Sequence, residues 1–269
     1  MRAMLIVVLI ATPSLMIPGT TSDTTQMVAL IAIFAGALTF FEYVSSYPGL
    51  IEFRDAPPFN RIRYLSLLIT ILVLSAMVRG QTHPSTLTNF LIVLGDRVGQ
   101  MIDVPYSPVR LVVLMLPEDM SLKHLILVRS AAGMAYVISL STVIFFTVTM
   151  RIMGWPQRIG TFNVWVNLPT FDPTTGGDVV ERLSRDARVN IALGFLLPFL
   201  VPAAVKMASM AFSPVTLENP HTLVWTMAAW AFLPASLFMR GVALARVARM
   251  IEQKRRGSAR KREHGLAAA

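Results

Sequence analysis

A lysine and two prolines lie inside one apolar stretch of the chain, residues 189–212. Lys206 follows Pro198 and Pro202, which are spaced one helical turn apart. Proline removes a backbone hydrogen bond and kinks a helix, and a broken helix beside a charge is how many transporters build a substrate site. The pattern predicts either a transport site or, because Phe212 lies only six residues further on, a lysine whose ammonium reaches the membrane surface.

Glu42 is a second candidate for transport chemistry, because it lies at the end of the apolar run 27–44. The carboxylate could pair with Arg61 or Arg63 across the loop that follows, or it could carry a proton. The third interpretation is an ordinary carboxylate at a helix end.

The loop after this run mixes aromatic and charged residues more densely than any other segment. Aromatic and arginine side chains dominate the energetics of protein interfaces, and three prolines stiffen the loop. We expect a rigid loop that docks on a partner or against the other loop on the same side, whereas an aromatic belt at the membrane surface is the alternative. The predicted partner-binding residues are Phe53, Arg54, Asp55, Phe59 and Arg61.

Three of the four histidines fall on the predicted outer side of the membrane, where carboxylates are also found. Imidazole and carboxylate are ligands for transition metals, but no spacing here forms a metal motif. We therefore expect no metal and no cofactor, and a membrane enzyme that uses these histidines is the third functional hypothesis. The residues concerned are His83, His124 and His221, with Glu118, Asp119 and Glu218.

The segment 151–188 contains a glycine pair followed by Asp178. Backbone amides at a glycine-rich helix start can bind anions, but the lysine of a phosphate-binding loop is missing, so Asp178 or Thr175 is expected to cap a helix over 178–188. Alternating apolar residues predict short strands over 160–167.

Composition sets the solvent in which these residues must work. The chain has 269 residues, of which 54% are hydrophobic and 14% are charged, against about 25% charged residues in a soluble domain. The excess indicates apolar surface that faces lipid. Cysteine is absent, so disulfides, thiolate metal sites and cysteine nucleophiles are excluded.

Six apolar runs predict an all-α membrane protein with six transmembrane helices. A helix needs about 20 residues to cross the hydrocarbon core, and the first and third runs are shorter than that. The first run could also be a signal peptide, but it lacks a small-residue cleavage site, so we expect an uncleaved helix. The runs are 3–17, 27–44, 64–78, 130–150, 189–212 and 222–239.

Arginine and lysine set the orientation, because these residues accumulate in cytoplasmic loops. With the N-terminus inside and six crossings, eighteen of them lie inside and five outside, while Lys206 lies within a run. We therefore expect a multi-pass protein of a bacterial inner membrane with both termini in the cytoplasm. The outer residues are Arg79, Arg97, Arg110, Lys123 and Arg129.

The outer connection between the third and fourth runs is predicted to contain a helix of its own. Residues 86–104 place apolar side chains on one face and Asp96, Arg97 and Gln100 on the other, which is typical of an amphipathic helix in the membrane interface. A second apolar piece, 110–116, is too short to span. It either covers the ends of the spanning helices or re-enters the membrane along a pathway.

The chain is predicted to be a single transmembrane domain, residues 1–245, followed by a basic cytoplasmic tail, residues 246–269. The tail has eight basic residues between Arg246 and Arg262, and basic residues near a membrane attract anionic headgroups. The net charge of +9 does not indicate nucleic acid binding, because the basic residues follow the topology.

No catalytic signature is present, so an enzyme is not favoured. The sequence favours a protein that acts by binding, as an accessory or assembly subunit of a larger membrane complex, with membrane lipids and a membrane protein as partners. The alternative function is a small secondary transporter with its site near the kinked fifth run.

Overall fold

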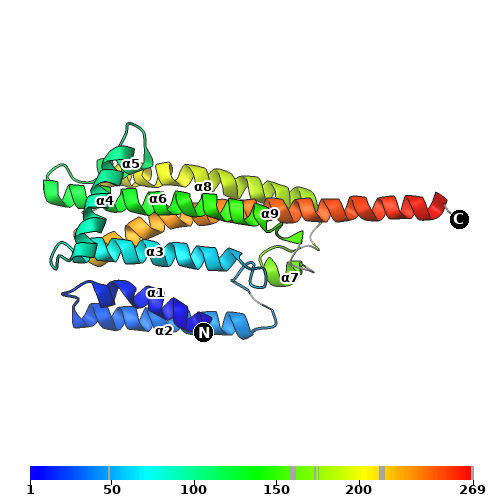
Figure 1. Ribbon diagram of the computed structural model, residues 1–269, viewed down its shortest axis with the longest axis horizontal. Helices are drawn as coiled ribbons and strands as arrows, with labels where there is room; N and C mark the ends of the chain where they lie inside the picture. Colours follow the sequence, from blue (N-terminus) through cyan, green and yellow to red (C-terminus); the bar gives the residue numbers. More distant parts are fainter. Residues whose placement is uncertain (48, 158–161, 173, 175, 212–215, 268–269) are drawn as a thin grey trace.

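The computed structural model describes residues 1–47, 49–157, 162–172, 174, 176–211 and 216–267 of the chain. Every regular element in these residues is helical, which confirms the predicted all-α class. The helices form an elongated bundle, and the last one extends alone beyond one end of it (Figure 1). In chain order they are α1 Arg2–Met16, α2 Ser22–Val44, α3 Phe59–Arg79, α4 Thr86–Ile102, α5 Pro108–Met115, α6 Leu122–Ile152, α7 Val164–Asn167, α8 Val179–Ser209 and α9 Pro220–Ala267.

Among the described residues, five helices are long and apolar enough to cross a membrane, so the chain is a multi-pass membrane protein. They are α2, α3, α6, α8 and α9. The helix α1 has only 15 residues, or about 22 Å at 1.5 Å per residue, against about 30 Å of hydrocarbon. Five of the six predicted spans are confirmed by length and composition, and the crossing by α1 stays a prediction.

The spanning helices are longer than the apolar runs that predict them. α8 begins at Val179 and takes in the helix expected over 178–188, so one continuous helix replaces two. α9 likewise continues from the last apolar run through the basic tail. A hydropathy pattern detects only the apolar turns of a helix, whereas the backbone hydrogen bonds of the helix continue through its polar turns. The helices are therefore longer than the apolar runs.

The helices α8 and α9 lie against each other because two glycines let their backbones meet. A Cβ on Gly194 of α8 would lie 2.7 Å from both the Phe238 amide nitrogen and the Pro234 carbonyl oxygen. A Cβ on Gly241 of α9 would lie 2.7 Å from the Ala187 carbonyl oxygen. Small residues at these two positions therefore set the separation of the helix pair.

The connection between α3 and α6 forms a layer across one end of the bundle (Figure 1). The predicted amphipathic helix is confirmed as α4, which begins at a capping box formed by Ser85 and Thr88. Gly99 of α4 meets Gly133 of α6, where an added Cβ would lie 2.8 Å from the Gly99 Cα. The apolar piece 110–116 lies in and just after α5, and Val109 and Val112 are fully buried, so this segment packs into the bundle end.

At the opposite end, which we call the tail end, lie the loops 45–58 and 153–178 and the start of the last part of α9, residues 246–267, which we call the α9 extension. The predicted strands in the second loop are wrong where they can be judged, because Val164–Asn167 is the helical turn α7; residues 158–161 lie outside the described part. A run of alternating apolar residues needs a neighbouring strand for its hydrogen bonds, and no strand is found among the described residues.

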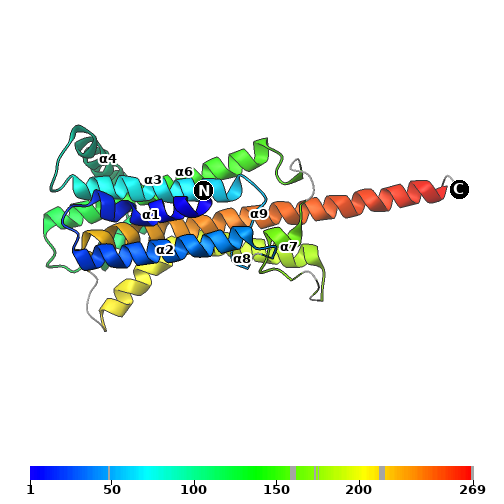
Figure 2. The ribbon, with the colours of Figure 1, turned by 90° about the horizontal axis from the view of Figure 1, so that it is seen from below.

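The hairpin of α1 and α2 lies at the edge of the bundle. α1 packs between α2 and α3, as Figures 1 and 2 both show. Only Ala32 and Gly36 of α2 are buried, and an added Cβ on Gly36 would lie 2.7 Å from the Val7 Cγ2 of α1. The remaining apolar surface of α2 is exposed, as expected of a helix whose solvent is lipid.

Candidate functional site

The two tail-end loops fold together around a cluster of aromatic rings. Phe53 and Phe59 are 1% and 0% exposed, and their ring centroids lie 4.4 Å apart. Trp155 of the second loop packs edge-on against Phe53 at 5.7 Å, and Phe146 of α6 packs against Phe59 at 5.6 Å. We call the loops 45–58 and 153–178, together with the start of α3 (residues 59–63), the tail-end platform.

Asn167 joins the two loops through hydrogen bonds. Its carbonyl oxygen accepts from the Phe53 amide at 2.7 Å, and its side-chain oxygen accepts from the Asp55 amide at 3.0 Å. Phe53 has a φ of 52°, a left-handed conformation that is rare for residues other than glycine. The bond to Asn167 and the burial of the ring hold this conformation in place.

Glu52 connects the platform to the last spanning helix. Arg240 of α9 donates to both carboxylate oxygens of Glu52, at 2.6 and 2.7 Å. Thr170 of the second loop donates to the same carboxylate at 2.9 Å. Because the Glu52 side chain is only 12% exposed, this two-point ion pair is partly desolvated, the setting in which such pairs are strongest.

Glu42 has a structural use in the same region. Its carboxylate accepts from the amides of Gly49, Leu50 and Ile51, at distances between 2.9 and 3.3 Å. Arg54 donates to the carbonyl oxygens of Glu42 and Ser45 at 2.9 and 2.7 Å. Glu42 therefore closes the loop as a cap, and these contacts involve neither Arg61 nor Arg63.

The five predicted partner-binding residues divide into two groups. Phe53, Phe59 and most of Arg54 face inward and hold the platform together, so the loop docks against the other tail-end loop. Asp55 and Arg61 are exposed. Of the five, only these two are exposed enough to meet another molecule, and Asp55 is at the same time paired with the Arg54 Nε at 3.6 Å.

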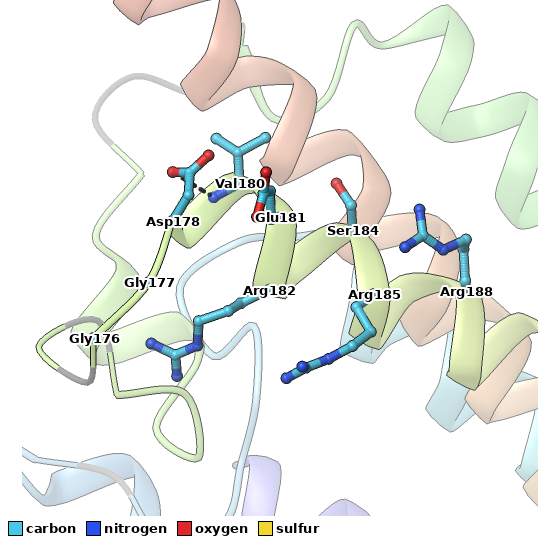
Figure 3. Close-up of a pocket in the computed structure, with 9 residues that line it drawn as sticks. All are labelled: Gly176, Gly177, Asp178, Val180, Glu181, Arg182, Ser184, Arg185 and Arg188. Atoms are coloured by element: carbon cyan, nitrogen blue, oxygen red, sulfur yellow. Dashed lines mark hydrogen bonds between the residues drawn. The ribbon is translucent and has the colours of Figure 1, made fainter.

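The start of α8 borders an open hollow on the same end of the molecule (Figure 3). Asp178 accepts from the Val180 amide at 3.3 Å, which confirms it as the helix cap. Arg255 of the α9 extension also donates to Asp178, and this bond is the main cause that holds the pKa of the Asp178 carboxyl below its usual value. The arginines along this face of α8 are Arg182, Arg185 and Arg188.

The kink in α8 is bonded to the neighbouring helix. Pro202 has no N–H for the Pro198 carbonyl oxygen, its normal helical partner, and the Trp230 indole N–H donates to that oxygen at 3.1 Å. Beyond this point α8 leaves the direction of the other helices (Figure 2). Lys206 is exposed in the last turn, so the kink and the lysine do not converge on a buried polar site.

Within the described part of the chain, no group of three His, Asp or Glu side chains, the predicted outer histidines included, is arranged so that it could hold a metal ion. His124 does lie near Asp119 and Glu218 at one hollow beside the α8–α9 connection. His83 instead bonds its neighbour Thr82 at 3.0 Å.

Sequence reasoning missed Glu52, Asn167 and Trp230, and Arg240 was counted only as one of the eighteen inner basic residues. Each acts through a partner at least 32 positions away, which no local pattern records. One signal was available: Glu52 is the remaining carboxylate in the loop 43–63 besides Asp55, and a buried carboxylate requires a cation.

Comparisons with known proteins give no relatives: no family model, no curated protein and no solved structure matches this chain.

Proposed function

We propose that this multi-pass protein acts by binding, as an accessory or assembly subunit of a larger complex in a bacterial inner membrane, and that the tail-end platform is its docking surface. One observation carries the proposal. The platform is fixed by ring packing at Phe53, by the Asn167 hydrogen bonds and by the ion pair of Glu52 with Arg240 of α9. Asp55 and Arg61, which are both exposed, are therefore held in a constant geometry, which lowers the entropy lost on binding.

The side of the membrane follows from charge. The platform, the start of α8 and the tail share the end of the molecule that holds most of the arginines and lysines, as the positive-inside rule requires of a cytoplasmic face. In this proposal the partner therefore contacts the protein from the cytoplasm, and both termini lie on that side.

The α9 extension supports a binding role as well. It continues the line of the bundle away from the spanning helices (Figure 1), and Lys254, Arg255 and Arg256 on it are exposed. The electrostatic potential of a membrane surface decays within about 10 Å, whereas residues ten positions apart on a helix are separated by about 15 Å. The outer part of the extension therefore lies beyond the reach of the headgroups and suits an acidic partner surface, while its base suits anionic headgroups. Nucleic acid is not part of the proposal.

The transport alternative receives less support from the geometry. It depends on Lys206, Pro198, Pro202 and Glu42, of which the lysine is exposed, both prolines are packed and the carboxylate is bonded by three amides. Loss of transport in Lys206→Ala with normal assembly would restore that alternative.

The test is purification of the full chain from native membranes in mild detergent. We expect a companion protein in fixed stoichiometry that is lost with Arg61→Glu or Asp55→Arg and retained with Arg97→Glu, an exposed charge reversal on α4 at the opposite end. Recovery as a lone homo-oligomer, or equal retention in all variants, would contradict the proposal.

A further inference from the structure

Among the described residues, three arginines bury their Nε atoms without a hydrogen-bond partner: Arg63, Arg129 and Arg246. Two of them use their other nitrogens, since Arg129 bonds Asp96 at 2.9 Å and Arg246 bonds the Met150 carbonyl oxygen at 3.1 Å. For Arg63, no acceptor is found among the described residues. The Arg63 Nε is a buried donor without a partner, which is unfavourable for a charged group, while the side chain as a whole is partly exposed. An anion can therefore reach the guanidinium group and supply acceptors.

The nearest carboxylate is already occupied. Arg63 lies within electrostatic range of both Glu52 and Arg240, but Glu52 accepts two bonds from Arg240 and one from Thr170. Asp186 of α8 is also within electrostatic range of Arg240, and it is paired with Arg185 at 3.9 Å. Three guanidinium groups thus share two carboxylates, and positive charge is left in excess beside Arg63.

Arg63 also lies at the depth of a phosphate group. It is four residues from the start of α3, about 6 Å along the helix axis, and the apolar run 64–78 begins with the next residue. The guanidinium carbon is 5.3 Å from the centre of the Phe59 ring, so the ring covers one side of the plane. Where an apolar run ends, lipid headgroups begin.

We propose that Arg63, with Arg240 beside it, binds a phosphate group, supplied by a phospholipid headgroup of the tail-end leaflet or by free inorganic phosphate. The planar guanidinium presents paired N–H donors that match phosphate oxygens. The anion neutralises the excess charge and supplies the acceptors that Arg63 lacks. This site is independent of the proposed docking function, because it uses the inward side of the platform rather than Asp55 and Arg61.

The test uses the full-length protein purified in a neutral detergent. Thermal unfolding is followed while phosphatidylglycerol, phosphatidylcholine or inorganic phosphate is added to the wild type, to Arg63→Gln and to Arg151→Gln. The control Arg151→Gln removes the same charge at an exposed position in the last turn of α6. We expect saturable stabilisation of the wild type and of Arg151→Gln, and at least roughly tenfold weaker binding by Arg63→Gln.

The added compounds distinguish a lipid headgroup from free inorganic phosphate as the source of the phosphate group. Stabilisation by phosphatidylglycerol with no response to inorganic phosphate assigns a lipid, and stabilisation by phosphate alone assigns a free anion. Equal responses of Arg63→Gln and the wild type overturn the proposal, as does a wild type that responds to neither.

If Arg63→Gln does not fold, Arg63→Lys keeps the charge but not the paired donors. We then expect binding by Arg63→Lys that is weaker than that of the wild type, and unchanged binding overturns the assignment to a guanidinium site.

Discussion

At the residue scale, the tail end depends on a few polar contacts between segments that are far apart in sequence. Glu52, Asn167 and Arg240 lie on the first loop, the second loop and α9, and their bonds hold the three segments together. Each group is at least partly buried, so losing one partner leaves the other without compensation.

The first prediction concerns the ion pair. Glu52→Gln should lower the free energy of unfolding by about 1–3 kcal/mol, because Arg240 loses its two-point ion pair and the negative charge nearest to Arg63 is removed. Glu52→Gln combined with Arg240→Gln should lose less than the sum of the single variants. Thermal unfolding in detergent measures the cycle, and simple additivity would show that the two groups are not coupled.

The second prediction concerns pH. Because Arg255 and the Val180 amide hold the pKa of Asp178 below its usual value of about 3.9, the folded state favours the carboxylate. The contact is therefore complete at neutral pH, and it is lost as the pH falls through the lowered pKa in acid. Spin labels at positions 184 and 253 should move apart in that range.

Asp178→Asn is the matched variant, because asparagine keeps the helix cap but has no titrating charge. Its label distance should not change between neutral and strongly acidic pH. An acid transition in this variant equal to that of the wild type would assign the change to another group.

At the scale of the elements, the long helices are positioned by small residues and by a proline kink whose free carbonyl oxygen accepts a hydrogen bond from the neighbouring helix. Gly194 and Gly241 bring the backbones of α8 and α9 together, and Trp230 supplies the hydrogen bond that Pro202 cannot. The last part of α8 can therefore diverge from the bundle while the helix pair stays bonded at the kink.

The third prediction tests the close contact. Gly194→Ala should destabilise the protein by about 1–3 kcal/mol, because the added methyl meets backbone atoms that cannot rotate away. Gly257→Ala is the control, since nothing lies within 4 Å of that position, and it should be neutral or slightly stabilising through helix propensity. Thermal unfolding compares them, and equal stability of the two variants would contradict the packing argument.

At the scale of the whole molecule, the number of crossings decides where the termini lie. Five spans are long enough by themselves, while α1 is short and packs between α2 and α3. Arg2 lies over the Tyr43 ring at 4.2 Å, so the start of α1 reaches the level of the end of α2. Contact with α2 along this length is consistent with a sixth crossing in a locally thinned bilayer.

The fourth prediction follows from that contact. Reporter fusions at the N-terminus and at the C-terminus should both report the cytoplasm, because six crossings return the chain to its starting side. Termini on opposite sides would mean that α1 does not cross, and the proposed orientation would then need to be redrawn.

The sequence by itself determined that much of the protein surface faces lipid, that the fold is all-α, and approximately which segments span the membrane. Hydropathy and the distribution of arginine act locally, through 20-residue windows and adjacent loops, so α2, α3, α6, α8, α9 and the amphipathic α4 were predictable. Helix ends were predicted poorly, because a helix continues through polar turns that hydropathy does not mark, as α8 and α9 show.

Only the tertiary structure decided which residues of the candidate site face inward. The loop composition predicted a rigid aromatic segment, but the burial of Phe53 and Phe59, the Glu52–Arg240 pair and the unpartnered Arg63 depend on segments up to 188 positions apart. The physical reason is that burial and charge pairing are properties of a packed neighbourhood, and that neighbourhood exists only once the helices have come together.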